Sequence, residues 1–423
     1  MLLRFLYSAS IIAFGWAIHF VSRKQGKARD WVKGRKGWRE RISSLSSLGD
    51  NWVWFHCASL GEFEQGRNLI DYLYDNHPEY RILVTFFSPS GYLVRSGYSK
   101  AHHVDYLPLD SPRNARFFIH QLRPVFGIFI KYELWVNTLL EAKKQNIPLI
   151  LVAARPNPSA LILKWPLRKL FRRAYLAFDH IFTQNETSEV LLEKLGHPSV
   201  SVSSDTRFDR VSSTKTHWSP IEPISQWVGN SPCLVAGSTW PRDEEILLEA
   251  WNQLAPQQRP KLIIAPHEIK DHRIDQQILK SNGSGIRHSH ISGIHHGHHI
   301  LWIDCIGLLA DLYAYADIAY VGGGFGTGLH NILEPAVFGA SLIVGPELRK
   351  FPEALDLQRA GGLKSIQSSA ELAGILQEEL NDPKRRAASG HINQRYVSER
   401  QGATKIISSW MYNSGWLTKR KSL

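Results

Sequence analysis

From Trp52 onward, short apolar runs alternate with amphipathic stretches, and this alternation constrains the fold more than any other feature of the chain. In the first half, strands are predicted at 52–58, 80–86, 125–130 and 148–152, with helices at 63–75 and 134–145. A second series of strands is predicted at 233–236, 261–265 and 318–321. Strands that alternate with helices indicate parallel sheets with helices on both faces. The sequence therefore predicts an α/β protein.

The chain has 423 residues, which is enough for two domains of ordinary size. Between the two series, residues 199–223 are rich in Ser, Thr, Asp and Pro and show little apolar periodicity, as expected of an interdomain connection. We expect two Rossmann-like domains that face each other across a cleft. The expected segments are an anchor helix (1–22), a basic juxtamembrane segment (23–50), a first domain (51–210), a linker (211–232), a second domain (233–392) and a C-terminal helix that packs back on the first domain (393–423).

The N-terminus is apolar from residue 2 to 21 and is interrupted mainly by Arg4, small polar residues and His19. This stretch has about the length needed to cross a bilayer. A dense cluster of cations follows it: Arg23, Lys24, Lys27, Arg29, Lys33, Arg35, Lys36, Arg39 and Arg41. The positive-inside rule places such a flank, and the rest of the chain, in the cytoplasm. The alternative is a helix that lies in an anionic membrane surface, with Trp16, Trp31 and Trp38 at headgroup depth.

The net charge of +12 is also typical of nucleic-acid-binding proteins, but no basic-helix, zinc-finger or RNP-like pattern accompanies it, so we expect no nucleic-acid partner. Three widely separated cysteines, each in or beside an apolar run, read as buried free thiols. Six histidines lie within 288–299 among Ser and Gly. We interpret this tract as a solvated loop that binds divalent ions opportunistically, and we expect no functional metal site.

A glycine-rich turn follows the predicted strand at 318–321 and leads into a helix that carries Asn331 and Glu334. Such a turn lets the backbone approach a ligand closely, and a helix start offers N–H groups to a phosphate. Glu334 is placed to accept hydrogen bonds from a ribose diol. The glycine spacing does not match a dinucleotide fingerprint. The pattern predicts a nucleotide or sugar-nucleotide site, and the alternative is a tight strand–helix turn capped by Asn331.

Polar residues follow the carboxyl ends of the other predicted strands, where doubly wound sheets bind ligands. In the first half these are Ser59, Gly61 and Glu62, then Glu133, then Arg155. Glu62 is the candidate general base. The alternative for Glu62 and Glu133 is a carboxylate favoured by the helix dipole, and for Arg155 an ion pair that braces the cleft wall.

In the second half, the same strand ends carry Ser238 and Thr239, His267, and the glycines Gly322, Gly323 and Gly324. Carboxylates and an arginine on one domain, with glycines and hydroxyls on the other, suit a transferase. The acceptor would bind to the first domain and a nucleotide donor to the second.

Five motifs occur in an order and spacing that resemble a known family. They are HCASLGE at 56–62, TFFSPSG at 85–91, KYELWVN at 131–137, GSTWPRDEE at 237–245, and the stretch from GG at 322–323 to GLHNILEP at 328–335. The chain resembles the lipid A Kdo transferases (3-deoxy-D-manno-octulosonic acid transferases), which are membrane-anchored glycosyltransferases of the GT-B fold. The resemblance extends from the N-terminus to at least Leu357.

This resemblance implies transfer of Kdo from CMP-Kdo to a lipid A precursor, with inversion, in lipopolysaccharide core biosynthesis at the cytoplasmic face of the bacterial inner membrane. It implies that Glu62 is the catalytic base, that Ser59, Gly61, Glu133 and Arg155 line the acceptor side, and that no cofactor or metal is needed. The residues implied in nucleotide binding are Arg207, Ser238, Thr239, His267, Gly322, Gly323, Gly324, Asn331 and Glu334.

The chain departs from the family pattern at Lys131, where the family has Glu, at Val136, where it has Pro, and at Ala153, where many relatives have Asn. These departures lie on the acceptor side. Two alternatives therefore stay open: a sugar-nucleotide epimerase of similar fold that acts on UDP-sugars, and a catalytically inactive, membrane-tethered sugar-nucleotide-binding protein.

Overall fold

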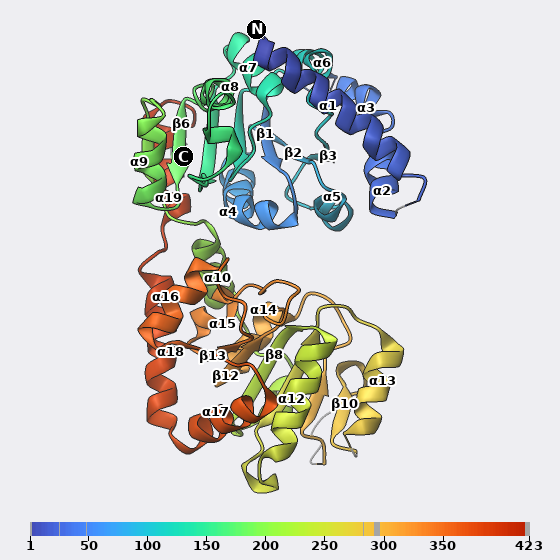
Figure 1. The fold of residues 1–423 in the computed structure, drawn as a ribbon, viewed down its shortest axis with the longest axis vertical. Helices are drawn as coiled ribbons and strands as arrows, with labels where there is room; N and C mark the ends of the chain where they lie inside the picture. The colour runs from blue at the N-terminus through green and yellow to red at the C-terminus, as the bar shows by residue number, and fades with distance from the viewer. Residues whose placement is uncertain (1, 25, 48, 282, 292–296, 419–423) are drawn as a thin grey trace. The chain divides into compact units, whose positions relative to one another are not determined.

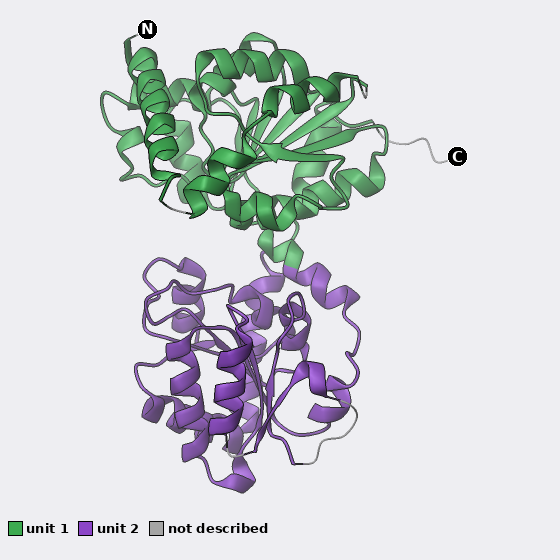
Figure 2. Ribbon diagram, turned by 90° about the vertical axis from the view of Figure 1, so that its right-hand side faces the viewer, with its two compact units in different colours: residues 1–210, 401–423 green, residues 211–400 purple. Residues whose placement is uncertain are grey.

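Two compact units make up the chain in the computed structural model, which describes residues 2–24, 26–47, 49–281, 283–291 and 297–418. Unit 1 comprises residues 1–210 and 401–423, and unit 2 comprises residues 211–400 (Figure 2). Each unit is built on a seven-stranded sheet in which every recorded strand pair is parallel (Figure 1). The predicted α/β fold class is thus confirmed.

In unit 1 the sheet order is β3-β2-β1-β4-β5-β6-β7. Its strands are β1 (Trp52–Cys57), β2 (Arg81–Phe86), β3 (His103–Tyr106), β4 (Phe126–Ile130), β5 (Leu149–Ala154), β6 (His180–Thr183) and β7 (Val200–Val202). Its helices are α1 (Leu2–Val21), α2 (Gly26–Gly34), α3 (Trp38–Ser46), α4 (Leu60–Asn76), α5 (Pro89–Arg95), α6 (Pro112–Leu122), α7 (Val136–Lys144), the short turn η1 (Leu161–Leu163), α8 (Arg168–Tyr175), α9 (Glu186–Lys194) and α19 (Ala403–Asn413). Strand order reverses between β1 and β4, so the crevice of this sheet lies at their carboxyl ends.

In unit 2 the sheet order is β10-β11-β9-β8-β12-β13-β14. Its strands are β8 (Cys233–Thr239), β9 (Lys261–Pro266), β10 (Gly285–Arg287), β11 (Ile300–Trp302), β12 (Ile318–Val321), β13 (Ser341–Val344) and β14 (Leu363–Ser365). Its helices are α11 (Ile224–Val228), α12 (Pro241–Gln253), α13 (Asp271–Lys280), α14 (Leu309–Leu312), α15 (Leu333–Phe338), α16 (Pro352–Ala360), α17 (Ser369–Asn381) and α18 (Pro383–Ser398). Here the order reverses between β8 and β12, and the crevice lies at their carboxyl ends.

The segment expected as a linker, 211–232, is largely helical. Helix α10 (Arg207–His217) runs across the boundary at residue 210, and α11 buries Ile224, Trp227 and Val228 in unit 2. The polar stretch that precedes α10 contains β7. The residues of β7 are only half-buried, because β7 is an edge strand with one neighbour. Partial burial explains why the sequence of β7 lacks an apolar run.

The C-terminal segment expected as one helix at 393–423 is divided between the units. Helix α18 belongs to unit 2, whereas α19 belongs to unit 1 and packs against α4. The Tyr412 hydroxyl lies 2.8 Å from His77 Nε2 and 3.1 Å from the Tyr72 hydroxyl. Ile407 and Met411 are fully buried in the unit 1 core. The first and the last described helices, α1 and α19, therefore both belong to unit 1.

Helix α1 is the one helix in the described ranges that is long and apolar enough to cross a membrane. One side of it binds unit 1: Arg4 Nε donates to Asn137 Oδ1 (2.8 Å), and the Tyr7 hydroxyl donates to Asp110 Oδ2 (2.7 Å). The remaining surface is exposed and apolar, with Phe5 and Trp16 exposed by 70% and 76%.

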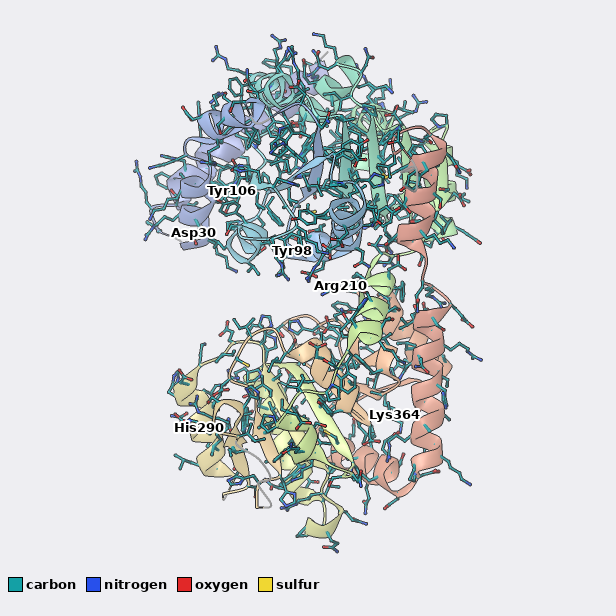
Figure 3. All side chains as sticks on the ribbon, turned by 180° about the vertical axis from the view of Figure 1, so that it is seen from behind. Asp30, Tyr98, Tyr106, Arg210, His290 and Lys364 are labelled. Carbon is teal, nitrogen blue, oxygen red and sulfur yellow. The ribbon has the colours of Figure 1, made fainter. Side chains whose placement is uncertain are left out.

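The basic segment after α1 folds into α2 and α3 and packs on unit 1. Placing Trp31 and Trp38 at headgroup depth is wrong, because both indoles are buried. Arg35 is also buried, stacks on the rings of Trp31 (3.7 Å) and Tyr106 (4.5 Å), and donates to the carbonyl of Leu107. Figure 3 labels Tyr106 and, on α2, Asp30. Part of the basic flank is thus structural.

Candidate functional site

The first candidate site, here called the carboxylate site, lies at the carboxyl ends of β1, β4 and β5 in unit 1. Ser59 begins α4 in an extended conformation, and Glu62 is in the first turn of that helix. The Ser59 hydroxyl donates a short hydrogen bond to Glu62 Oε2, which orients the carboxylate. Gly61 is exposed and Glu62 is half-buried. The structure thus brings these three predicted residues together at the crevice of the sheet.

Glu133 follows β4, on the other side of the strand reversal. Its Oε2 accepts a hydrogen bond from Trp135 Nε1 (2.6 Å) and lies 3.2 Å from Nε2 of the fully buried His56. His56 Nδ1 lies 2.9 Å from the Thr85 hydroxyl. Glu133 is therefore held by a buried polar network, and His56 is a positioning residue whose role cannot be read from its position within a strand.

Arg155 follows β5 and is half-buried, and it makes no hydrogen bond or ion pair with any residue that the structure describes. Burial raises the pKa of the neighbouring Tyr132 phenol. The positive charge of Arg155 opposes this increase in the pKa of Tyr132, and the negative charge of Glu62 adds to it. Arg155 and Glu62 are therefore close enough to Tyr132 for the charge of each to affect the ionisation of that phenol. An unpaired guanidinium in that position is suited to an anionic ligand.

Arg207 lies at the start of α10 in unit 1, within the expected first domain, whereas the other residues implied in nucleotide binding lie in unit 2. Its Nη2 lies 2.9 Å from Oδ2 of the buried Asp205, which also accepts from Gln65 Nε2 (3.0 Å). Burial alone would raise the pKa of Asp205, but the charge and hydrogen bonds of Arg207 lower it below its usual range. Since Gln65 is on α4, this network ties Arg207 to the helix of Glu62.

The second candidate site, here called the glycine-turn site, lies at the carboxyl ends of β8, β9 and β12 in unit 2. Gly322 is buried, and a Cβ there would lie 2.3 Å from the Ser238 carbonyl oxygen. Gly323 has a φ of 90°. The glycines Gly322, Gly323 and Gly324 are all buried. Their lack of side chains allows the two turns to approach each other, and this contact, rather than a ligand, requires Gly322.

Asp243 joins these two turns. Its Oδ2 accepts from the backbone N–H of Trp240 (2.9 Å) and of Gly323 (3.0 Å), and its Oδ1 accepts from the Tyr320 hydroxyl (2.6 Å). Asp243 is 1% exposed. In the sequence, Asp243 stands out only as part of the motif at 237–245, although an acidic residue three positions after the N-cap, here Trp240, is a typical capping signal.

The predicted hydroxyl residues differ in their surroundings. Thr239 is fully buried and its hydroxyl donates to Glu244 Oε1 (3.1 Å), so its side chain holds the turn in place. Ser238 is half-buried, with a φ of 52° at a register shift in β8. Non-glycine residues with positive φ also occur at Lys131 and Ala153, next to the carboxylate site. Such backbone strain gathers at functional sites.

An aromatic stack lies over the glycine turn. The exposed ring of His267 stacks on Trp240 (4.6 Å between centroids) and contacts His330 (4.5 Å). Trp240 Nε1 donates to His330 Nε2 (3.2 Å), which requires a neutral imidazole. Burial, with the nearby His267, lowers the pKa of His330 to about 4. A flat face of this kind suits a nucleobase or sugar ring.

Asn331 and Glu334 also lie together. Asn331 Nδ2 donates to Glu334 Oε1 (3.1 Å), and Asn331 Oδ1 accepts from the Leu333 N–H (3.2 Å). The helix behind them, α15, begins at Leu333, so Asn331 precedes it and does not lie on it. This local contact is similar to the capped turn of the alternative interpretation, but the N-cap position of α15 is Ile332 and not Asn331.

No group of three or more His, Cys, Asp or Glu side chains arranged for a metal ion occurs in the described part of the chain. In the histidine tract, His295 and His296 lie outside the described residues. Cys57 and Cys233 are buried, whereas Cys305 is exposed, 3.6 Å from His288 Nδ1, so the prediction that it is buried is wrong.

Comparison with known proteins identifies the family. Residues 36–210 match the family model described as 3-deoxy-D-manno-octulosonic-acid transferase (kdotransferase). The chain is 30% identical to the enzyme of that name from Rickettsia bellii over 82% of this chain and 83% of the relative, and 26% identical to the one from Haemophilus influenzae over 92% of both.

The fold is similar to that of the UDP-GlcNAc 2-epimerase from Neisseria meningitidis (TM-score 0.61, 16% identity, 86% of this chain and 100% of that one). It is also similar to that of S. aureus MnaA in a co-structure with UDP (TM-score 0.58, 15% identity, 88% and 99%). These likenesses concern the fold alone, which is of the GT-B type. On sequence, the chain belongs to the 3-deoxy-D-manno-octulosonic acid transferase family, and it is therefore a glycosyltransferase.

Proposed function

We propose that the chain transfers Kdo from CMP-Kdo to a lipid A precursor, with Glu62 as the general base. The observation that carries this proposal is the position of Glu62, whose carboxylate is oriented by Ser59 at the crevice of the unit 1 sheet. A carboxylate in this position can accept the proton of an acceptor hydroxyl. The oxygen then attacks the anomeric carbon of Kdo and CMP departs with the bonding electrons, with inversion of configuration.

The acceptor is proposed to bind to the carboxylate site. Lipid A precursors carry phosphates, and Arg155 is a half-buried guanidinium that no described residue neutralises. Tyr132 is 48% exposed next to it and offers a hydroxyl and an aromatic face. The network behind Glu133 fixes that carboxylate close to the same strand ends. We propose that Arg155 and Glu133 orient the acceptor while Glu62 removes its proton.

The donor is proposed to bind to the glycine-turn site. The stack of Trp240, His267 and His330 presents a flat surface for the cytosine ring. The joined side chains of Asn331 and Glu334 are suited to the ribose hydroxyls. Ser238 and the backbone of the glycine turn are proposed to contact the single phosphate.

We propose that the reaction needs no cofactor or metal, since the leaving group is a nucleoside monophosphate that cationic side chains and backbone N–H groups can stabilise. We also propose that the protein works at the cytoplasmic face of the bacterial inner membrane. The apolar helix α1 and the basic residues that follow it support this location.

Transfer is tested with the detergent-solubilised protein, CMP-Kdo, a tetra-acylated lipid A precursor and EDTA, with products counted by mass spectrometry. Glu62→Gln should lower kcat by roughly 10²–10⁴-fold, because the change removes only proton transfer. Its affinity for CMP, measured by calorimetry, should equal that of the wild type.

The matched control is Glu64→Gln, on the same helix, whose carboxylate pairs with Arg95 (2.7 Å). It should retain activity. If Glu62→Gln transfers Kdo at the wild-type rate, Glu62 is not the base. If the wild-type protein binds CMP but yields no product, the proposed acceptor is wrong. If transfer stopped in EDTA and was restored by an added metal ion, the proposal of a metal-independent reaction would be wrong.

A further inference from the structure

The segment that connects β5 to α8 exposes large apolar side chains. Leu161 in η1 is 73% exposed and Trp165 is 81% exposed, and Leu167 follows at 37%. A tryptophan indole exposed to this extent is costly in water, and a cluster of such residues typically marks an interaction surface. We call residues 161–173 the 161–173 segment.

The same segment is strongly cationic. Its exposed cations are Lys164, Arg168, Lys169, Arg172 and Arg173. None of these five forms an ion pair with a residue that the structure describes, and no Asp or Glu occurs between Glu141 and Asp179. Arg172 Nε donates to the Leu195 carbonyl (2.5 Å), which holds that side chain against unit 1. The segment thus presents one sign of charge around exposed apolar groups.

The 161–173 segment lies beside the N-terminal half of α1. Leu170 and Ala174 fix α8 in the unit 1 core. On the same helix, the Phe171 ring makes an edge contact with the Tyr7 ring of α1 (6.2 Å between centroids). Figure 1 shows α1 and α8 at the same end of unit 1. Leu2 and Phe5, each 70% exposed, belong to the free face of α1. Two exposed apolar elements are therefore adjacent.

We propose that the 161–173 segment is a second membrane-binding element, distinct from α1, which inserts Leu161 and Trp165 into the interface of an anionic bilayer. Tryptophan is favoured at headgroup depth, and basic residues around an apolar face bind anionic lipid. The proposal does not require the proposed function to be correct. The connection that leads into the segment leaves β5 at Arg155, so insertion would place the carboxylate site close to the lipid surface.

An anionic bilayer accounts for the segment better than a folded protein partner does. Lysine and arginine attract acidic lipid headgroups individually, without the matched geometry that ion pairs across a protein interface need. The two most exposed apolar side chains also lie on a short connection, not on a wide flat surface.

The first test is co-sedimentation of the full-length protein with vesicles of phosphatidylethanolamine and phosphatidylglycerol. Lys169→Glu/Arg173→Glu should weaken binding by roughly thirtyfold or more. Leu161→Ser/Trp165→Ser should weaken it by roughly tenfold or more. The matched controls are Lys384→Glu/Lys405→Glu and Leu279→Ser/Ile306→Ser, which change exposed residues elsewhere and should bind like the wild type.

The second test measures the environment of the 161–173 segment itself. It is needed because α1 alone can keep the protein bound to vesicles. Trp165→Cys in a Cys305→Ser background places one exposed thiol at this position, since the other cysteines are buried. An NBD label there should shift to the blue on phosphatidylglycerol vesicles and be quenched by doxyl-labelled lipid. An unchanged spectrum on vesicle-bound protein would overturn the proposal. The proposal would also be overturned if all variants bound anionic and phosphatidylcholine vesicles equally well. It would likewise be overturned if the substitutions in the segment abolished self-association of the protein and left vesicle binding unchanged.

Discussion

At the scale of single residues, buried polar groups organise both candidate sites. In the carboxylate site, His56 and Asp205 hold Glu133 and Arg207. In the glycine-turn site, Asp243 holds the backbone of two turns. Burying a carboxylate is costly unless several donors satisfy it, so each of these residues fixes the geometry around it.

Asp243→Ala should lower the free energy of unfolding by at least about 3 kcal/mol, because it leaves the N–H groups of Trp240 and Gly323 and the buried Tyr320 hydroxyl without an acceptor. Urea unfolding measures this loss. Glu245→Ala is the control on the same helix, since Glu245 is exposed and pairs only with Arg242 among the described residues. Equal stability of the two variants would contradict the role assigned to Asp243.

The neutral state of His330 predicts a pH dependence of stability. The pKa of His330 is about 4 in the folded protein, and the ordinary value for a histidine in an unfolded chain is 6.5. Between pH 4 and pH 6.5 the unfolded state therefore binds more protons than the folded state does. The folded protein should therefore lose stability as the pH falls from 6.5 to 4. We expect a contribution of about 2 kcal/mol from this residue, less than the full shift in pKa corresponds to, because the imidazole is only half-buried and solvent screens it.

His330→Gln removes the titrating group, so the free energy of unfolding should decline less steeply over the same interval. Urea titrations at several pH values measure the slope. Trp240→Phe, which keeps the histidine but removes the hydrogen-bond donor, separates the titration from the hydrogen bond. A slope that His330→Gln leaves unchanged would show that burial of this imidazole is not linked to folding.

At the scale of secondary-structure elements, the contact between the turn after β8 and the turn after β12 decides the form of the glycine-turn site. Gly322→Ala would place a methyl group 2.3 Å from the backbone oxygen of Ser238. Backbone atoms cannot move aside as a flexible side chain can, so the turns must separate. We expect a loss of roughly 2–3 kcal/mol in stability and weaker CMP binding.

The control for this prediction is Gly374→Ala in the middle of α17, where an added Cβ meets no atom within 4 Å. It should be neutral or stabilise the protein by up to about 1 kcal/mol, because alanine is the better helix former. If both substitutions are neutral in thermal unfolding and CMP calorimetry, the close approach of the two turns does not control the site.

Central elements were easier to predict than edge elements. The strand at 318–321 coincides with β12, and that at 52–58 contains β1, because both strands are buried in the middle of a sheet and read as apolar runs. The strands β3, β6, β7, β10, β11 and β14 were missed. Each of them has only three or four residues, which is too short for a clear apolar run. In addition, β3, β7, β10 and β14 stand at the ends of the sheet orders, where one neighbour is absent.

At the scale of the whole molecule, unit 1 is completed by the end of the chain. Asp209 accepts hydrogen bonds from the backbone N–H groups of Gly402 and Thr404 (2.6 Å each), which fixes the start of α19. Ile407, Met411 and Leu417 are then buried against strands and helices formed more than 300 residues earlier. The chain thus passes from unit 1 to unit 2 and returns.

Truncation of the chain after Arg400 should therefore lower the free energy of unfolding of unit 1. Each of the three apolar side chains that are lost contributes about 2 kcal/mol to that free energy. Hydrogen exchange followed by mass spectrometry should show faster exchange in β1 and α4 and unchanged exchange in β8 and α12. A chain that ends at Thr418 keeps α19 and is the control. Uniform protection in the shorter chain would mean that α19 is not part of the unit 1 core.

The sequence by itself determined the α/β class, the central strands, and the strand ends at which Glu62, Arg155 and Ser238 stand, because these follow from local periodicity and from residues adjacent in the chain. Only the tertiary structure decided that Arg207 binds Asp205 beside α4, that Trp31 and Trp38 are buried, and that α19 joins unit 1. Those outcomes depend on packing between residues distant in sequence. Local patterns of polarity do not encode which distant partner a side chain will meet.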